Sequence, residues 1–248
     1  QDVYEKRPLG DTILELKDFS GEGFHNINLT VKKGSIVGLT GLQGAGSSEL
    51  MQCMFGVTRA YSGEMRAMGK VMRDHSIHTA MKDQIAMLAS NRKENSVIPD
   101  MSILENMYLS EHTLSAWKPA ISKKKEIESY KKYKEMLNIK ANSCEDPITS
   151  LSGGNQQKVV LGRWLMTEPK ILLLDEPTRG IDVGAKAEIY QLINNLAKQG
   201  MAIIVVSSEL PEVIGISDRI VTFCEGELTG EYLQEEATQE KLLQSATK

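Results

Sequence analysis

Residues 151–158 read Leu-Ser-Gly-Gly-Asn-Gln-Gln-Lys, and residues 171–178 read Ile-Leu-Leu-Leu-Asp-Glu-Pro-Thr. The four apolar residues that open the second run do not alternate with polar ones, which predicts a parallel strand buried on both faces. Asp175 and Glu176 follow at the carboxyl end of this strand, where open α/β sheets bind ligands. That place suits Asp175 to hold Mg²⁺ and Glu176 to orient or deprotonate a water. Two solvated carboxylates in a turn are the alternative.

The first quoted run is rich in small residues. Ser152, Gly153 and Gly154 form a predicted turn whose backbone N–H groups can approach a phosphate closely. The apolar residues between Val159 and Leu165 predict a helix after this turn, with its positive N-terminus facing the anion. Taken alone, Ser-Gly-Gly would be an ordinary loop, so its interpretation as a phosphate-binding turn depends on the strand that follows.

A second strand, Ile36–Thr40, runs into a glycine-rich loop and then into apolar residues at helical spacing. This order is that of a P-loop, whose template is G-x-x-x-x-G-K-[ST]. Ser47 stands where the template has lysine, and a serine cannot supply the ammonium charge. A hydrogen bond to a charged group contributes about 1.5–3 kcal/mol, so its loss predicts about ten- to a hundredfold weaker nucleotide binding and slow hydrolysis. The predicted phosphate-binding residues are Gly41, Gly44, Ala45, Gly46, Ser47, Ser48 and Glu49, with Ser48 also a Mg²⁺ ligand beside Asp175.

Together these runs resemble a known family. Residues 151–158 are similar to the signature loop of ATP-binding cassette (ABC) ATPases, and residues 171–178 to their Walker B strand. The chain most resembles the C-terminal cassette of double-cassette ATPase subunits in bacterial monosaccharide importers of the ribose and galactose type. The resemblance implies an α/β fold, a P-loop NTPase of ABC type with a RecA-like core, an antiparallel β subdomain and an inserted helical subdomain. The matching runs are 41–46, 49–50, 92–93, 101–103, 105–107, 151–186, 207–212 and 217–220.

Two positions depart from the catalytic pattern of ABC ATPases. Ser47 replaces the lysine, and Ser208 replaces the switch histidine that reaches the γ-phosphate. In second cassettes of this importer type the lysine is often arginine and the histidine gives way to Ser-Ser, so Ser47 is an unusual version of an expected change. Asn91 is the nearest analogue of the Q-loop glutamine. Asp182 matches the aspartate that crosses the dimer interface in this family, and it also suits the N-cap of the next helix.

The resemblance also implies partners. In this family two cassettes pair head to tail, and each ATP lies between the P-loop of one and the signature loop of the other. We therefore expect this chain to complete the ATP site of the N-terminal cassette of the same polypeptide, while its own P-loop forms a degenerate site. ATP and Mg²⁺ are the expected cofactors. Membrane permease subunits and, indirectly, a sugar-binding protein are the expected partners, which places the chain in the cytoplasm on the inner face of the bacterial membrane. The signature residues are Leu151, Ser152, Gly153, Gly154, Asn155 and Gln156.

Composition argues against other classes of protein. The 248 residues carry a net charge of −4, and the sequence lacks the basic face or aromatic ladder expected of a nucleic-acid-binding protein. The longest apolar runs fall far short of the roughly 18–20 residues that a membrane helix needs. The three cysteines have no metal-ligand spacing, which favours reduced thiols. Phe24 could stack on a nucleotide base, but a core or surface role is the favoured interpretation.

The order of motifs predicts five parts. Residues 1–12 form a linker from a preceding cassette, residues 13–91 a first core part with antiparallel strands and the P-loop, and residues 92–150 a helical subdomain. Residues 151–230 form a second core part with the signature, Walker B and switch strand, and residues 231–248 a C-terminal tail. The start at Gln1 fits a fragment of a longer chain or a processed terminus. Two other functions stay open: a soluble ABC ATPase outside transport, which would ordinarily need the lysine and histidine, and a non-hydrolytic nucleotide-sensing regulatory module.

Overall fold

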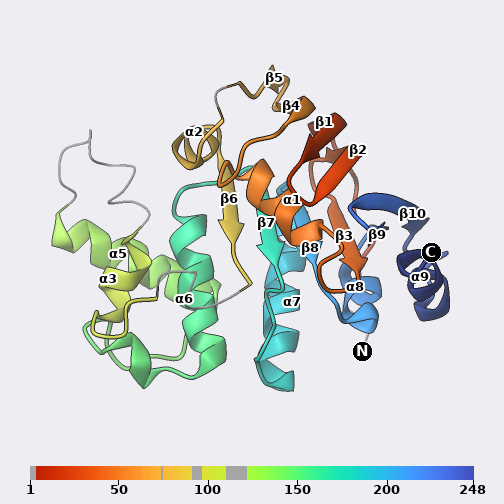
Figure 1. Cartoon of the computed structure of the whole chain (residues 1–248). Coiled ribbons are helices and arrows are strands. Elements are labelled where there is room, and N and C mark those ends of the chain that lie inside the picture. The colour runs from red at the N-terminus through yellow and green to blue at the C-terminus, as the bar shows by residue number, and fades with distance from the viewer. Residues whose placement is uncertain (1–3, 74, 91–96, 110–121) are drawn as a thin grey trace.

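Two β-sheets organise the chain in the computed structural model, which describes residues 4–73, 75–90, 97–109 and 122–248 (Figure 1). The strands are β1 (Thr12–Gly21), β2 (Phe24–Lys32), β3 (Ile36–Gly41), β4 (Ser62–Ala67), β5 (Lys70–Val71), β6 (Ile85–Leu88), β7 (Ile171–Asp175), β8 (Ala202–Val206), β9 (Arg219–Cys224) and β10 (Glu227–Leu233). The helices are α1 (Ser47–Met54), α2 (Ile77–Lys82), α3 (Ile103–Met107), α5 (Lys123–Met136), α6 (Gly153–Leu165), α7 (Val183–Lys198), α8 (Leu210–Ile216) and α9 (Gln239–Ala246).

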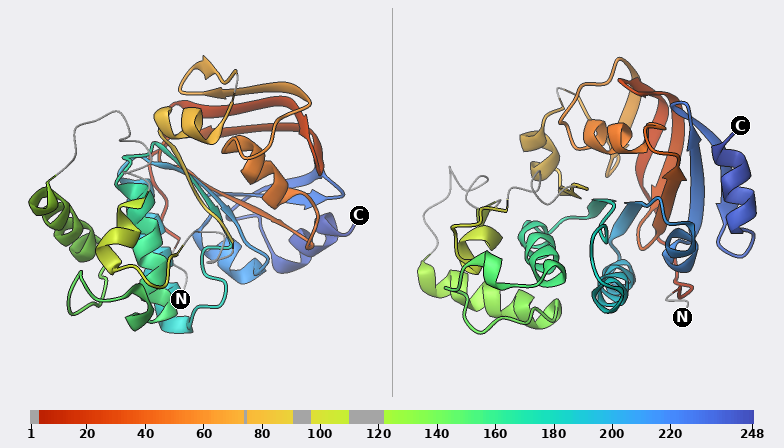
Figure 2. Two further views of the ribbon diagram at one scale, coloured as in Figure 1. Left: turned by 60° about the vertical axis from the view of Figure 1, so that its left-hand side comes forward. Right: turned by 60° about the horizontal axis from the view of Figure 1, so that its bottom comes forward.

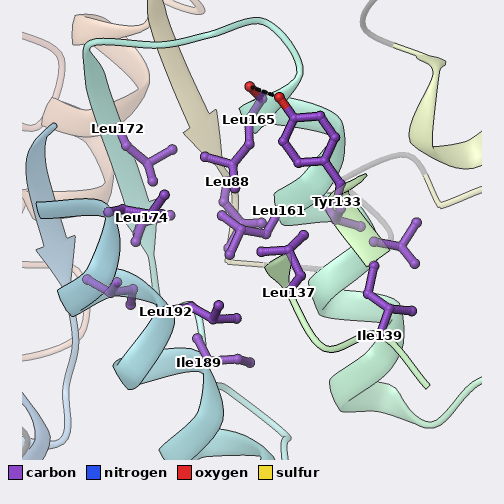
Figure 3. Packing of buried hydrophobic residues seen from close by; sticks show 14 of the residues in the cluster. Leu88, Tyr133, Leu137, Ile139, Leu161, Leu165, Leu172, Leu174, Ile189 and Leu192 are labelled. Atoms are coloured by element: carbon purple, nitrogen blue, oxygen red, sulfur yellow. Dashed lines mark hydrogen bonds between the residues drawn. The ribbon is translucent and has the colours of Figure 1, made fainter. Parts of the chain in front are cut away.

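The larger sheet has the order β10-β9-β3-β8-β7-β6 and is parallel except at β10. All residues of β7 are buried. Leu172 and Leu174 enter a core shared with α6 and α7, while Ile171 and Leu173 enter a second core shared with α1 and the antiparallel strands (Figure 3). This confirms the predicted strand with two buried faces. It also explains the uninterrupted apolar run, because neither face of β7 meets solvent.

The smaller sheet is antiparallel, with the order β2-β1-β4-β5. Leu14 pairs with Val31 and Leu16 with Leu29, and these alternate residues turn their side chains into the second core. Phe24 is only 1% exposed. Its burial makes Phe24 a core residue, one of the two roles favoured from the sequence over stacking on a nucleotide base.

Helices α3, α5 and α6 form a lobe to one side of the large sheet, with α3 yellow and α5 and α6 in shades of green in both views of Figure 2. Tyr133 of α5 donates a hydrogen bond from its hydroxyl to the Leu165 carbonyl at 3.2 Å, which fixes α5 against the end of α6 (Figure 3). The expected helical subdomain, 92–150, lies here in part, although residues 92–96 and 110–121 are outside the described ranges. None of the helices in the described ranges is both long and apolar enough to cross a lipid bilayer.

Both end segments of the chain pack on the large sheet. Arg7, in the expected linker, is buried, and its guanidinium donates to the Gly34 carbonyl, the Asn194 side chain and the Asp218 carboxylate at 3.1, 2.9 and 2.5 Å. At the other end β10 continues through Glu231 into the expected tail, and Leu242 of α9 is fully buried. The sequence pattern does not predict the burial of Arg7 at one end or of Leu242 at the other.

Candidate functional site

The glycine-rich loop joins the carboxyl end of β3 to the first turn of α1. Gly46 is the N-cap of α1, with φ 116°, and a Cβ there would lie 2.4 Å from the Gly23 carbonyl oxygen. Only glycine therefore fits, for reasons of both backbone conformation and space. The first N–H groups of a helix lack partners within it and carry a partial positive charge. This loop thus presents backbone donors and a helix dipole to an anion, as a phosphate cradle requires.

Asp175 ends β7 directly beside this helix start. Its side chain is buried, and the Ser48 hydroxyl donates to Asp175 Oδ1 at 3.2 Å. Burial raises the pKa of Asp175 to about 6, and the charge of Glu176 adds to the rise. The Ser48 hydrogen bond and the Arg179 charge act in the opposite direction but are outweighed. The carboxylate is therefore poorly solvated and would gain from a cation.

The pair Ser48–Asp175 fits a magnesium ion in its chemistry. A hydroxyl and a carboxylate oxygen, both hard ligands, meet at 3.2 Å from two different elements. Mg²⁺ keeps several waters and takes one or two side chains together with phosphate oxygens. Across the described ranges no group of three or more His, Cys, Asp or Glu could form an all-protein cage. The predicted residues, Ser48 and Asp175, are thus brought together with a donor set of the right kind.

Glu176 links the end of β7 to the loop after β8. Its φ is 48°, an unusual conformation for a non-glycine residue, and its N–H donates to the Val206 carbonyl at 2.8 Å. Its Oε1 accepts the Ser208 backbone N–H at 2.9 Å and lies 3.4 Å from Arg179 Nη2. Ser208 therefore contributes its backbone to this contact. The Glu176 carboxylate is thus held on two sides, by the Ser208 N–H and by Arg179.

A cavity of about 380 Å³ opens between these parts. It brings together the predicted phosphate-binding residues, Glu176 and Ser208. Asn91, the predicted Q-loop analogue, lies outside the described residues, but its neighbour Ser90 lines the cavity. The lining residues are Gly41, Leu42, Gln43, Gly44, Ala45, Gly46, Ser47, Ser48, Glu49, Ser90, Glu176, Arg179, Val206, Ser207 and Ser208.

Sequence reasoning missed Ser90 and Arg179. Ser90 follows β6, which pairs in parallel with β7, so its position beyond a strand end was the available signal. For Arg179 the sequence offered a weaker indication of a place in the cavity, because the residue lies in a turn and the direction of its side chain depends on tertiary packing. Both residues add polar groups to the cavity.

The signature run lies apart from this cavity. Ser152 is the N-cap of α6, and its Oγ accepts the Asn155 backbone N–H at 3.3 Å and the Asn155 side-chain amide at 3.0 Å. Asp182 caps α7 in the same way, with Oδ1 accepting the Ala185 N–H at 3.0 Å. A Cβ on Gly154 would lie 2.6 Å from the Ala185 Cβ, so the starts of α6 and α7 are in close contact.

These two loops form one exposed surface of neighbouring helix starts. Leu151 is buried and Ser152 exposed, while Gly153, Asn155 and Gln156 are half-buried. The Gln156 side-chain amide donates to the Leu151 carbonyl at 3.0 Å, which closes the turn before α6. None of the residues of the run from Leu151 to Gln156 lines the P-loop cavity.

A family model described as ABC transporter matches residues 24–179. The chain belongs to the ABC transporter ATPase family. It superimposes on the crystal structure of the ADP conformation of MJ1267, an ATP-binding cassette of an ABC transporter, with a TM-score of 0.81 at 21% identity over 95% of this chain and 98% of that one. The comparison with a post-hydrolysis dimer of the ATP-binding cassette MJ0796 bound to ADP and Pi gives a TM-score of 0.77 at 23% identity, over 90% of this chain and 99% of that one. These likenesses confirm the predicted ABC-type ATPase fold.

Sequence relatives are import ATP-binding proteins. The chain is 45% identical to the ribose import ATP-binding protein RbsA of Oceanobacillus iheyensis over 98% of its length, which is 49% of that protein. It is 45% identical to the arabinose import ATP-binding protein AraG of Mannheimia succiniciproducens over 99% of its length, or 50% of that protein. The chain thus spans about half the length of the curated relatives that it matches.

Proposed function

We propose that this chain is the second, C-terminal nucleotide-binding domain of an ATPase subunit that powers a bacterial sugar importer. The observation that carries this is the 45% identity along nearly the whole chain to half of a ribose import and half of an arabinose import ATP-binding protein. Ribose and arabinose are both monosaccharides, so a monosaccharide is the proposed substrate class. Membrane permease subunits and a sugar-binding protein are the proposed partners, with the chain at the inner face of the cell membrane.

The cavity of this chain is proposed to be the degenerate site of the pair. Ser47 brings no charge to the phosphates, and Ser208 meets Glu176 through its backbone. Mg²⁺, when bound, would neutralise phosphate charge, and Ser48 with Asp175 would hold it. Glu176 Oε1 accepts the Ser208 N–H, so an attacking water would have to be oriented by Oε2 or by a further lone pair of the same carboxylate. Weak nucleotide binding and slow turnover in this cavity follow from these features.

The signature residues are proposed to act in trans. Ser152 is exposed and Val183, next to Asp182, is 84% exposed, so the paired starts of α6 and α7 are open to another molecule. An exposed helix start with free N–H groups suits the phosphates of an ATP held by another P-loop. We propose that this P-loop belongs to the N-terminal cassette of the same polypeptide, whose ATP this chain then helps to hydrolyse.

The test is Ser152→Arg in the two-cassette subunit assembled with its permease in lipid vesicles. We expect ATPase activity and sugar uptake to fall to background, because a long cation replaces the hydroxyl at the proposed trans contact. Ser122→Arg is the matched control, since Ser122 is also an N-cap serine, accepting the Lys125 N–H at the start of α5. Activity retained in the Ser152 variant would refute the proposal.

The two alternatives give different results with this chain alone. Steady hydrolysis without a partner would favour a soluble ABC ATPase outside transport. Tight nucleotide binding with neither turnover nor a permease partner would favour a nucleotide-sensing regulatory module. Co-purification of the subunit with a permease would argue against both.

A further inference from the structure

The P-loop cavity contains one cation that no P-loop template supplies. Its charged lining residues are Glu49, Glu176 and Arg179, so within the described part of the chain Arg179 is its single basic side chain. Without a lysine at position 47, the two acids would leave this cavity net negative, which opposes the binding of a phosphate chain. Arg179 offsets one of these two negative charges, so it is the group that lessens the repulsion of a phosphate chain.

Local structure fixes the base of Arg179 at the end of β7. Its backbone N–H donates to the Glu176 carbonyl at 3.2 Å, which closes a turn directly after the Walker B strand. Its Nη2 lies 3.4 Å from Glu176 Oε1, while 56% of the side chain is exposed. Its positive charge also lowers the pKa of Asp175, against the larger effect of burial. The guanidinium is therefore tethered close to the metal-binding residues without being buried.

Other cations on neighbouring elements are already engaged. Lys186 of α7 makes ion pairs with Glu209 and Glu212, both at 3.2 Å, and does not line the cavity. Lys158 of α6 is buried in an ion pair with Glu188. Arg179 differs because its partner, Glu176, lines the same cavity and its side chain is still half in solvent.

We propose that Arg179 is the phosphate-binding cation of this site and takes the charge role that lysine has in an intact P-loop. A guanidinium has five N–H donors in a planar fork, so Nη2 can keep Glu176 while the other nitrogens donate to phosphate oxygens. The ligand class is a magnesium-bound nucleoside triphosphate. This inference rests on the proposed nucleotide cavity of this chain and explains how a cavity without lysine could still retain nucleotide.

The test is calorimetric titration of this chain with Mg·ATP. Arg179→Ala should weaken binding about ten- to a hundredfold, the contribution of one charge-assisted hydrogen-bonded contact. Arg179→Lys should recover part of the loss, because it restores charge without the fork. Arg66→Ala is the control, since Arg66 also pairs with a nearby acid, Glu64 at 2.9 Å, but does not line the cavity.

A double-mutant cycle separates a phosphate contact from simple neutralisation of Glu176. Ser47→Lys should strengthen Mg·ATP binding far more in the Arg179→Ala background than in the parent, because the two cations would serve the same phosphates. Arg179→Ala should still weaken binding in the Glu176→Gln background; no further loss there would overturn the proposal, because Arg179 would then act only by neutralising Glu176. Unchanged binding in Arg179→Ala, or no detectable binding by the parent chain, would overturn it as well.

These results are independent of the trans proposal. The titrations probe only the cavity of this chain and leave Ser152 untouched, whereas failure of the trans proposal would appear as retained ATPase activity in Ser152→Arg complexes. A matching thermal unfolding midpoint for each variant excludes loss of fold as the cause of weak binding.

Discussion

Replacing Asp175 by asparagine should stabilise the chain in the absence of metal and nucleotide. The carboxylate is 4% exposed, and burial raises its pKa from the ordinary 3.8 to about 6. Each pKa unit corresponds to 1.36 kcal/mol, so the ionised side chain destabilises the fold by about 3 kcal/mol at pH 8. Asp175→Asn removes the charge, keeps the shape and leaves an oxygen for the Ser48 hydroxyl. The expected gain is therefore about 3 kcal/mol at pH 8.

The pH dependence of this gain follows from the direction of the pKa shift. A raised pKa in the folded state means that Asp175 favours folding only while protonated. That contribution is complete below pH 3.8 and is lost as the pH rises through about 6. The stability gap between Asp175→Asn and the parent should thus be constant above about pH 7 and fall to about half its size at pH 5.

Urea unfolding at pH 5, 6, 7 and 8, followed by circular dichroism in EDTA, measures this gap. At pH 8 the gain should raise the thermal midpoint by about 6–12 °C for a chain of this length. Asp11→Asn is the control, because Asp11 is exposed and the substitution makes the same change of charge at the surface. Any constant effect of the amide cancels in the comparison between pH values. A gap that stays level from pH 8 to pH 5, or widens, would refute the reasoning.

Three further substitutions test other parts of the structure. Arg7→Met leaves the Asp218 carboxylate without its cation, and we expect a loss of about 3 kcal/mol in urea unfolding; Asp218→Asn should recover part of it. Gly46→Ala places a methyl 2.4 Å from the Gly23 carbonyl oxygen at a φ of 116°, so Mg·ATP binding by titration should disappear and the thermal midpoint should fall. Ser152→Ala removes the N-cap of α6 and should lower stability by about 1 kcal/mol, whereas nucleotide binding to this chain's own cavity should not change.

Local sequence patterns were enough to predict the elements whose conformation and burial depend on residues close together in the chain. The apolar run ending at Asp175 specified a strand buried on both faces, because a strand exposed on one side needs polar residues at every second position. The glycines before Ser48 specified a tight loop at the start of α1, because a positive φ and close backbone contact exclude side chains. Asp182 was foreseen as an N-cap because a short acid before a helical pattern has that use.

Contacts between distant segments were outside the reach of such patterns. Arg7 looks like a solvent-exposed linker residue in the sequence, yet it is buried against Asp218 from the other end of the chain. Phe24 follows a glycine, and the sequence left core, surface and base-stacking roles open; only the packing of the small sheet shows it in the core. Such contacts depend on which segments come together when the chain folds, and the local sequence does not record this.

The resemblance to ABC ATPases indicated the fold, and the sequence by itself determined the buried strand that ends at Asp175, the glycine-rich loop before α1 and the absence of lysine at position 47. Those properties depend on neighbours within a few residues, where backbone conformation and burial leave a readable pattern. Only the tertiary structure decided that Arg179 and Ser90 enter the same cavity as Ser47. Their placement depends on the parallel pairing of β6, β7 and β8, which brings the ends of strands from distant parts of the chain to one edge of a sheet.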